Sequence, residues 1–413
     1  MATQTGYKAS ELGMIPQDWD VVELEEVAEI KSGGTPSTNR PEFWNGHILW
    51  CTPTDITSLS GKYLSDTNRK ISELGLNNSA AELLPTGSVL MTSRATIGEC
   101  AIVKRPMTTN QGFKNFICNR TVNNEFLYYL LSSQKDKFIE LCNGSTFLEI
   151  STTQVLKFKI TIPKSITEQT AIATVLSDTD ALISSLQTLI AKKQAIKLSA
   201  MQNLLSGKIR LPEFTQRPDG SSKTTRQTEL GLLPEDWEVV ELGSVAFIKT
   251  GSKNNQDKKE NGQYPFFVRS ATVEQIDTYS YDCEAILIPG EGNIGSIFHY
   301  INGKFDAHQR VYVIRDFYNV IGKFVFFALK QNFGKHAMEN TVKATVDSLR
   351  LPTFQNFKFA IPKSTTEQTA IAQLLSDMDA EIEALECRLK KTQSLKQGMM
   401  QALLTGKIRL PLE

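Results

Sequence analysis

Two long segments of the chain carry seam residues at the alternating three- and four-residue spacing of a coiled coil. The first seam consists of Ile172, Leu176, Thr179, Ile183, Leu186, Ile190, Lys193, Lys197, Ala200 and Leu204. The second consists of Ile371, Leu375, Met378, Ile382, Leu385, Leu389, Thr392, Lys396, Met399 and Leu403. The pattern predicts two helices of about 40 residues, each roughly 60 Å long at a rise of 1.5 Å per residue. Each seam becomes polar toward its C-terminal part.

Local signals mark both ends of these helices. Each start has the Ser-x-x-Glu spacing of a capping box, in which the Glu side chain reaches back to the cap amide. A proline stands before each start, and a glycine suited to a left-handed conformation follows each end. These residues are Pro163, Ser165, Glu168 and Gly207 in the first segment, and Pro362, Ser364, Glu367 and Gly406 in the second. A further apolar column of Val175, Leu182, Leu189 and Ile196 is expected to widen the buried face of the first helix.

The segments before each helix, roughly 20–160 and 229–360, have the pattern of β structure. Their short apolar runs are rich in β-branched and aromatic residues and are bounded by Gly, Asn, Asp or Pro. Examples are GSVLMTS, GECAIVK, KNFICNR, YPFFVRS, EAILIPG, GSIFHYI and RVYVIRD. Short helices are expected over Asn124–Cys142 and Val320–Met338.

The chain is an internal duplication whose framing pieces stayed alike. Ile162–Pro212 and Ile361–Pro411 are identical at 31 of 51 aligned positions, and Glu11–Gly33 and Glu229–Gly251 at 15 of 23. The seam pattern alone fits plain core helices equally well. Two nearly identical faces in one chain, however, most simply pack on each other, and the returning second helix then runs antiparallel to the first.

We therefore expect an α+β fold with two β-rich domains, an antiparallel pair of long coiled-coil helices and an internal pseudo-twofold repeat. The expected boundaries are 1–160 for the first β-rich domain, 161–212 for the first helix, 213–228 for a linker, 229–360 for the second domain and 361–413 for the second helix. Trp19 and Trp237, in the repeated Asp-Trp step, are expected to be core anchors.

The two β-rich segments are distantly related to each other. Val89–Val103 aligns with Ala285–Tyr300, with Ile97-Gly98 matching Ile294-Gly295 and, a little later, Gln111 matching Gln309. The second segment also contains Gly290-Glu-Gly-Asn-Ile-Gly295, which satisfies the dinucleotide-binding pattern G-x-G-x-x-G. That site needs a helix after the last glycine, and the residues that follow have a strand pattern, so we interpret the motif as a β-turn.

Charge and composition narrow the possible functions. Lys plus Arg and Asp plus Glu both number 45, so no net charge attracts the whole protein to nucleic acid, and any such binding must come from local patches. The N-terminal residues lack the apolar stretch of a secretory signal, and no apolar run is long enough to span a membrane. Six scattered cysteines without metal spacing are typical of reduced thiols, so we expect a cytoplasmic protein.

No motif for catalysis is evident. The chain has no P-loop, no H-E-x-x-H, no G-x-S-x-G, no N-P-P-Y or D-P-P-Y tetrapeptide, and no histidines with metal-ligand spacing. This pattern favours a binding protein or scaffold over an enzyme, with no cofactor and no metal held by this chain.

The chain resembles the specificity subunits of type I restriction-modification systems over nearly its whole length. The resemblance rests on the paired IPKS-x-TEQTAIA segments, the two LL-x-GKIRLP endings, the two ELG-x-x-P-x-DW-x-VVEL openings, and the TSRATIG and NQGF pieces. The second β-rich segment departs from the last two, with PGEGNIG and AHQRV in their places. The resemblance implies two target recognition domains, each of which reads one half of a bipartite double-stranded DNA site. It also implies that the helix pair acts as the spacer between them.

The resemblance also implies partners. Two methyltransferase subunits would dock on the conserved helices and bring S-adenosylmethionine, and restriction or translocase subunits using ATP and Mg²⁺ would join them. Candidate partner contacts are the outer apolar residues Val175, Leu182, Leu189, Ile196, Leu374 and Leu395.

Base-reading residues should be polar side chains on loops of a rigid sheet. In the first domain we predict base contacts for Thr92, Ser93, Arg94, Asn110, Gln111 and Lys114, and phosphate contacts for Lys31 and Arg40. In the second we predict base contacts for Arg269, Glu291, Asn293, His308, Gln309 and Arg310, and phosphate contacts for Lys253, Lys258 and Lys259. Any one of them can instead be an ordinary solvated residue, Lys258 and Lys259 above all.

One alternative stays open from the sequence. The chain can be a DNA-independent scaffold whose two β-rich domains bind protein or peptide, and basic residues gathered on one face would favour DNA instead. A fused methylating or cleaving enzyme is disfavoured by the missing motifs.

Overall fold

The computed structural model describes residues 6–142, 148–340 and 348–411, and the chain divides into two compact units. Unit 1 consists of Met1–Thr188 with Glu386–Glu413, and unit 2 of Leu189–Leu385. Each expected β-rich domain lies within one unit, whereas each long helix contributes to both. The first five residues, where no secretory signal is expected, lie outside the described part.

Unit 1 is built on a five-stranded sheet of order β4-β11-β8-β9-β6 and a three-stranded sheet of order β10-β5-β7. Two small antiparallel pairs, β1-β2 and β3-β12, complete it. Its strands are β1 Tyr7–Ser10, β2 Gly13–Pro16, β3 Trp19–Glu23, β4 Ala28–Ser32, β5 Trp44–Cys51, β6 Tyr63–Leu64, β7 Arg69–Ile71, β8 Val89–Thr92, β9 Cys100–Val103, β10 Met107–Thr109, β11 Phe113–Cys118 and β12 Lys159–Pro163. Its helices are α1 Leu24–Val27, η1 Pro41–Phe43, α2 Pro53–Thr57, α3 Glu73–Asn77, α4 Asn124–Ser133, α5 Lys135–Glu140, α6 Thr152–Leu156 and the first part of α7 Ile166–Leu204.

Unit 2 is built on a six-stranded sheet of order β16-β21-β19-β20-β17-β18, with the pairs β13-β14 and β15-β22. Its strands are β13 Thr225–Thr228, β14 Gly231–Pro234, β15 Trp237–Glu241, β16 Phe247–Thr250, β17 Tyr264–Phe267, β18 Val273–Ile276, β19 Tyr281–Pro289, β20 His299–Ala307, β21 Val311–Arg315 and β22 Lys358–Pro362. Its helices are α8 Leu242–Val245, η3 Asn255–Asp257, α9 Gly322–Glu339, α10 Leu351–Gln355 and the first part of α11 Thr365–Leu403. The 3-10 turn η2 Pro212–Phe214 lies between α7 and β13.

The predicted elements are confirmed. The apolar runs form strands, except that the first four residues of GSIFHYI, 295–298, lie before β20 begins at His299. Strands β8 and β9 are buried at every position, as expected of central strands. The expected short helices are α4 with α5, and α9, while α7 and α11 are each 39 residues long. Gly207 and Gly406 have φ of +68° and +69°, so both helices end through a left-handed glycine.

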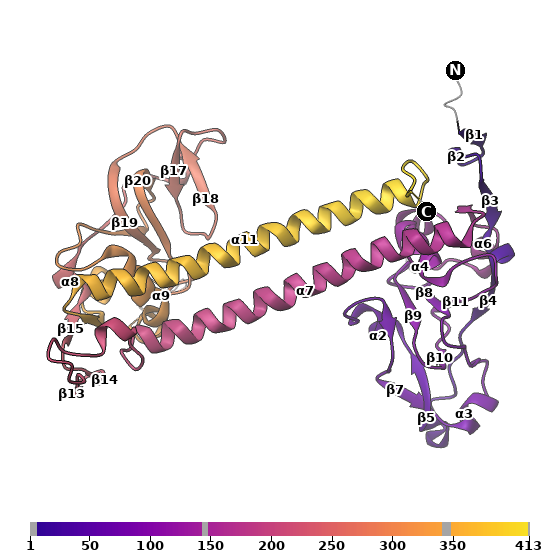
Figure 1. Ribbon diagram of the computed structural model, residues 1–413, viewed down its shortest axis with the longest axis horizontal. Helices are drawn as coiled ribbons and strands as arrows, with labels where there is room; N and C mark the ends of the chain where they lie inside the picture. Colours follow the sequence, from indigo (N-terminus) through magenta and orange to yellow (C-terminus); the bar gives the residue numbers. More distant parts are fainter. Residues whose placement is uncertain (1–5, 143–147, 341–347, 412–413) are drawn as a thin grey trace. The chain divides into compact units, whose positions relative to one another are not determined.

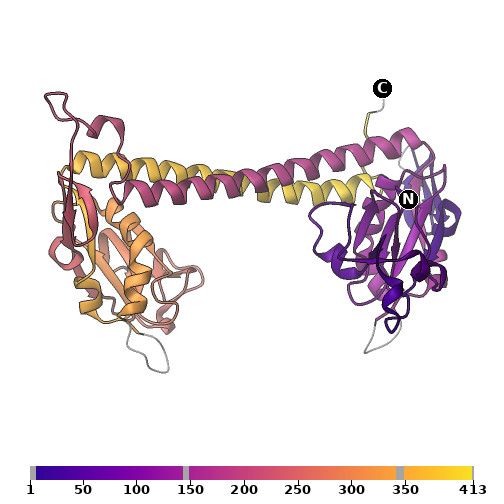
Figure 2. The same cartoon turned by 90° about the horizontal axis from the view of Figure 1, so that it is seen from below.

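Within each unit, the start of one long helix lies beside the end of the other, so the two run antiparallel (Figures 1 and 2). Every predicted seam residue is buried or half-buried. The polar part of each seam is explained by ion pairs between the helices. Lys396 binds Asp180 at 2.6 Å in unit 1, and the equivalent pair in unit 2 is Lys197 with Asp379.

The outer apolar column does not widen the buried face. Val175 and Leu374 are half-buried, but Leu182, Leu189, Ile196 and Leu395 are exposed to solvent. The expectation that this column is buried is therefore wrong for Leu182, Leu189 and Ile196, which no element covers within the part of the chain that the structure describes. Leu395 is predicted only as a partner contact.

The core of each unit is closed by the end of the other repeat's helix. In unit 1, Leu403 and Leu404 pack in the cluster that contains Trp19. In unit 2, Leu204 and Leu205 pack in the cluster that contains Trp237. Both tryptophans are fully buried, which confirms them as core anchors.

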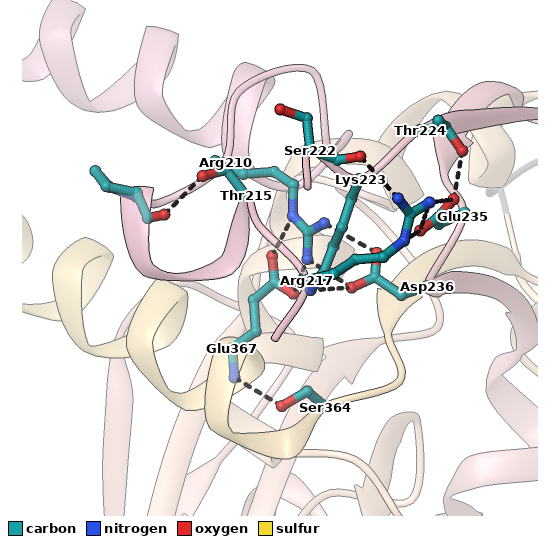
Figure 3. A network of polar contacts seen from close by, with 11 residues as sticks. Arg210, Thr215, Arg217, Ser222, Lys223, Thr224, Glu235, Asp236, Ser364 and Glu367 are labelled. Carbon is teal, nitrogen blue, oxygen red and sulfur yellow. Dashed lines mark hydrogen bonds and ion pairs between the residues drawn. The ribbon is translucent and has the colours of Figure 1, made fainter. Parts of the chain in front are cut away.

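An arginine from the same ending then ties each unit together. In unit 2, the Arg210 guanidinium donates to both oxygens of Glu367 at 2.9 and 2.5 Å and to both oxygens of Asp236 at 2.9 Å (Figure 3). In unit 1, Arg409 binds Glu168 at 2.6 and 2.8 Å and Asp18 at 2.8 and 2.7 Å. We call these two clusters the arginine clasps. Their carboxylates come from the opening and the helix start of one repeat, and their arginine comes from the ending of the other.

The clasps correct the capping-box prediction. Ser165 and Ser364 do accept from the amides of Glu168 and Glu367, at 3.4 and 3.5 Å. The two Glu side chains do not return to the cap amide, because each is buried against its arginine.

The glutamine after each Glu fastens the unit to the helix start. Gln169 and Gln368 are completely buried. Each donates to the preceding proline carbonyl at 2.8 Å. Each also accepts from the N-cap residue of α4 or α9, through the amide of Asn123 at 2.7 Å or of Ile321 at 2.8 Å. The repeated Thr-Glu-Gln motif therefore encodes one clasp partner and one internal anchor.

Replacing Arg210 by Met should destabilise unit 2 by about 3–5 kcal/mol, because Glu367, only 1% exposed, would be left charged and unpaired. Hydrogen–deuterium exchange at the first turns of α11 measures this loss. Arg217→Met is the matched control, since its partner Glu235 is more accessible and the cost should be about 0–1 kcal/mol. Adding Glu367→Leu to Arg210→Met should restore part of the protection, and equal losses from both single variants would contradict the clasp.

Candidate nucleic-acid interface

The strongest candidate interface is the hairpin tip in each unit, between β8 and β9 in unit 1 and between β19 and β20 in unit 2. Three features of backbone geometry coincide. The amides of Ser93 and Gly290 donate to the carbonyls of Gly112 and Arg310 at 2.7 and 2.8 Å. The carbonyls of the same two residues accept from Ile150 and Leu349 at 3.2 and 2.8 Å, and Ala95 and Gly292 both have positive φ.

The side chains on these equivalent tips differ in charge. In unit 1, Arg94 projects from the tip and binds Glu149 at 2.8 Å. In unit 2, the equivalent residue is Glu291, which binds Arg269 at 3.3 Å and Arg310 at 3.1 Å. One scaffold thus presents an arginine paired with one glutamate on the first tip and a glutamate between two arginines on the second.

The predicted glutamines also occupy equivalent places. Gln111 accepts from Thr35, in the Gly-rich loop after β4, and Gln309 donates to Asn254 at 2.7 Å, in the loop after β16. The loops approach so closely that only glycine fits: a Cβ on Gly33 or Gly251 would lie 2.0 or 2.1 Å from a backbone oxygen. Asn110 accepts from the Gly112 amide at 2.9 Å, which shapes the turn before β11.

The Gly290–Gly295 motif is a turn between two strands, as interpreted from the sequence. Gly292 and Gly295 have φ of +86° and +70°, and no helix follows them. Asn293 lies in this turn, where its carbonyl accepts from Ser296 at 2.8 Å.

Four predicted base contacts are buried in the structure and are corrected here. Thr92, Ser93, Lys114 and His308 have almost no exposed surface. Thr92 Oγ1 accepts from the Glu99 amide at 3.0 Å and donates to the Thr96 carbonyl, so it holds the tip in shape. These four residues are buried because the buried strands continue into the tip, and their role is to hold the tip in position.

Burial also shifts the pKa of two of these groups. It lowers the pKa of Lys114, whose ammonium donates to Ser32 at 3.1 Å. Burial, and then Arg269 and Arg310, lower the pKa of His308, so that ring is neutral near pH 7 and its Nδ1 accepts from the Arg310 amide at 3.0 Å.

The residues predicted to contact phosphate do not lie beside the predicted base-contact residues, except for Lys253. Lys253 lies beside His308 and 3.8 Å from the buried Asp306. Lys31 binds Glu82 at 2.5 Å, Arg40 binds Glu42 at 3.1 Å, and Lys258 binds Glu274 at 3.5 Å. Lys259 lies in the same loop as Lys258, where its amide donates to Gln275.

Sequence reasoning missed Glu149 as the partner of Arg94, together with Thr35 and Asn254 in the flanking loops. It also missed both clasp arginines, although the repeated Gly-Lys-Ile-Arg ending was a usable signal. Among the described residues, no cluster of three or more His, Cys, Asp or Glu could hold a metal ion. In the same part of the chain, no helix is long and apolar enough to cross a membrane.

The chain thus contains two copies of one frame, and each copy presents a different set of polar side chains on an equivalent tip. The family described as "Type I restriction modification DNA specificity domain" matches residues 16–197 and 234–393. The chain belongs to this family.

Individual relatives agree. The type I restriction enzyme MjaIX specificity subunit of Methanocaldococcus jannaschii is 35% identical over 66% of this chain and 64% of its own length. The EcoDI specificity subunit of Escherichia coli is 35% identical over 42% of this chain and 38% of its own length. These alignments span less than two thirds of either relative. The S subunit of a type I restriction-modification system from M. genitalium has the same fold, with a TM-score of 0.63, 14% identity and coverage of 100% of this chain and 99% of that chain.

The roles of Thr92 and Ser93 can be separated by substitution. Thr92→Val removes two buried hydrogen bonds and should destabilise the tip by about 1–3 kcal/mol. Ser93→Ala should be neutral or slightly stabilising, because Ser93 Oγ is buried without a partner among the described residues. Exchange protection of the Glu99 amide measures both, and unchanged protection in Thr92→Val would contradict the positioning role.

Proposed function

We propose that this chain is the DNA sequence-recognition subunit of a type I restriction-modification complex and has no catalytic activity of its own. Each unit reads one half of a bipartite double-stranded site through its hairpin tip. The two shared helices act as the spacer, so the gap between the half-sites is constant.

The observation that carries this proposal is the pair of tips with equivalent backbones and different charges. A protein that reads two unlike half-sites needs the same docking geometry twice and different chemistry at the point of contact. Arginine pairs with guanine O6 and N7, glutamate accepts from cytosine N4, and glutamine or asparagine pairs with adenine. Arg94, Gln111, Glu291, Arg269 and Arg310 provide these groups on surfaces held by buried strands.

The carboxylates paired with the tip arginines have a role in selectivity. Glu149 and Glu291 occupy the arginines in the free protein, and a base edge must replace that pairing for binding to be favourable. A wrong base leaves an arginine or a carboxylate without a partner, which is the costly outcome. His308, held neutral, adds no charge to this contact.

The chemistry of the complex resides on partners. Two methyltransferase subunits bring S-adenosylmethionine and dock on the repeated frame, where the exposed column residues Leu182, Leu189, Ile196 and Leu395 provide apolar contact area. Restriction subunits that use ATP and Mg²⁺ join this core. Duplication of the frame gives two equivalent places for two copies of one partner.

Genome-wide adenine methylation tests the function directly. A host with this chain and its methyltransferase should show a two-part methylated motif with a fixed gap, and that motif should vanish when only this chain is removed. An unchanged pattern in a demonstrably assembled complex would contradict the proposal and favour a scaffold that acts without DNA.

Single substitutions on the tips should affect one half-site each. Arg94→Ala should weaken binding to a duplex with the full site by about 5- to 150-fold, the equivalent of about 1–3 kcal/mol, and relax selectivity only in the half-site of unit 1. Glu291→Gln should relax only the other half-site. Arg120→Ala, at an exposed residue just after β11, is the control and should change affinity less than threefold. Equal effects of Arg94→Ala on both half-sites would contradict the division of labour.

A further inference from the structure

Each unit contains a groove of the same build. The groove of unit 2 has a volume of about 980 Å³ and that of unit 1 about 660 Å³. Four equivalent elements line both: the small hairpin (β1-β2 or β13-β14), the strand before the long helix (β12 or β22), a helical segment (α4-α5 or α9), and the end of the other repeat's long helix.

The hairpin side of each groove keeps large apolar side chains in solvent. In unit 1, Leu12 is 47% and Met14 is 51% exposed. In unit 2, the equivalent Leu230 is 47% and Leu232 is 65% exposed. Both pairs line the grooves, and both belong to the frame that stayed alike. The duplication has thus preserved exposed apolar surface at two equivalent positions, whereas the tips diverged in charge.

The opposite sides of the grooves are basic. Lys137 and Lys407 line the groove of unit 1, and Lys208 and Lys335 line that of unit 2. Lys335 lies 3.9 Å from Glu339, a carboxylate that also lines the groove of unit 2. Lys407 and its counterpart Lys208 form no ion pair with any other residue in the described part of the chain. A third lysine in each groove is already neutralised, because Lys159 binds Glu11 at 2.7 Å and Lys358 binds Glu229 at 2.8 Å. An occupant must therefore combine apolar side chains with carboxylates.

We propose that each groove is a docking site for an amphipathic, acidic segment of the methyltransferase subunit, one copy per groove. This inference rests on the proposed function, which requires two copies of one partner. The segment's apolar side chains would cover Leu12 and Met14, or Leu230 and Leu232, and its carboxylates would pair with Lys407 or Lys208. Duplex DNA fits these grooves less well, because phosphate binding uses cations and gives no reason to keep four large apolar side chains exposed.

The construction of the grooves ties docking to the clasps. Lys208 lies two residues before Arg210, in the ending that closes unit 2, and Lys407 lies two residues before Arg409, in the ending that closes unit 1. A partner segment that binds these lysines therefore recognises the closed unit and holds the clasp arginine in place.

Native mass spectrometry of the full chain co-expressed with its methyltransferase subunit tests the docking site. The wild-type chain should carry two methyltransferase subunits. Leu12→Asp/Met14→Asp and Leu230→Asp/Leu232→Asp should each carry one, and the combined variant none, with at least tenfold weaker binding at each altered groove. Leu74→Asp/Leu83→Asp, at exposed leucines outside the grooves, is the matched control and should retain two.

Charge variants separate docking from misfolding. Lys208→Glu should release one methyltransferase, whereas Lys208→Arg should retain it, and both should keep the thermal unfolding temperature of wild type. Two bound methyltransferase subunits in the combined apolar variant would overturn the docking site. The same holds if the groove variants keep their methyltransferases but lose affinity for DNA or the ability to self-associate. If wild type itself recruits no methyltransferase and confers no methylation motif, the proposed function fails; a normal motif with all groove variants means that only the docking inference fails.

Discussion

The arginine clasp is the interaction on which the rest of the structure depends. A guanidinium is planar and always charged, so it can satisfy two carboxylates at once through parallel hydrogen bonds. Arg210 and Arg409 do this where the β-rich part of a unit, the start of one long helix and the end of the other meet. Burial of Glu168 and Glu367 makes this geometry obligatory, because either carboxylate would be costly to leave unpaired.

The position of the hairpin tips follows from this junction. The buried glutamine beside each clasp Glu anchors the N-cap residue of α4 or α9, and the sheet packs against that helix. Buried strands then carry the tip backbone, and its own amides hold it in shape. Because buried strands and backbone hydrogen bonds hold the tip, the side chains of Arg94 and Glu291 can differ in charge while the surrounding backbone geometry stays the same.

Much of this could be predicted from sequence because it depends on local or repeated signals. The seams, Gly207, Gly406 and the strand runs follow from periodicity and backbone preference, and the duplication predicted the antiparallel pairing. The partner of Glu168 could not be found that way: its spacing from Ser165 fits a capping box, whereas its true partner, Arg409, is 241 residues away. At the tips, the motif located the turn, but the burial of Thr92 and Lys114 and the pairing of Arg94 with Glu149 depend on how the strands and the adjoining loop pack.

The crossed origin of the clasps has a consequence for how such a chain can change over time. Asp18 and Glu168 belong to the first repeat, but the residue that they bind, Arg409, belongs to the second. A substitution in one ending therefore affects the stability of the other repeat's clasp. Correlated substitutions should link positions 18, 168 and 409, and separately positions 236, 367 and 210. The two repeats therefore cannot change independently at these positions, whereas their variable segments can. The repeated frame is expected to evolve as one unit.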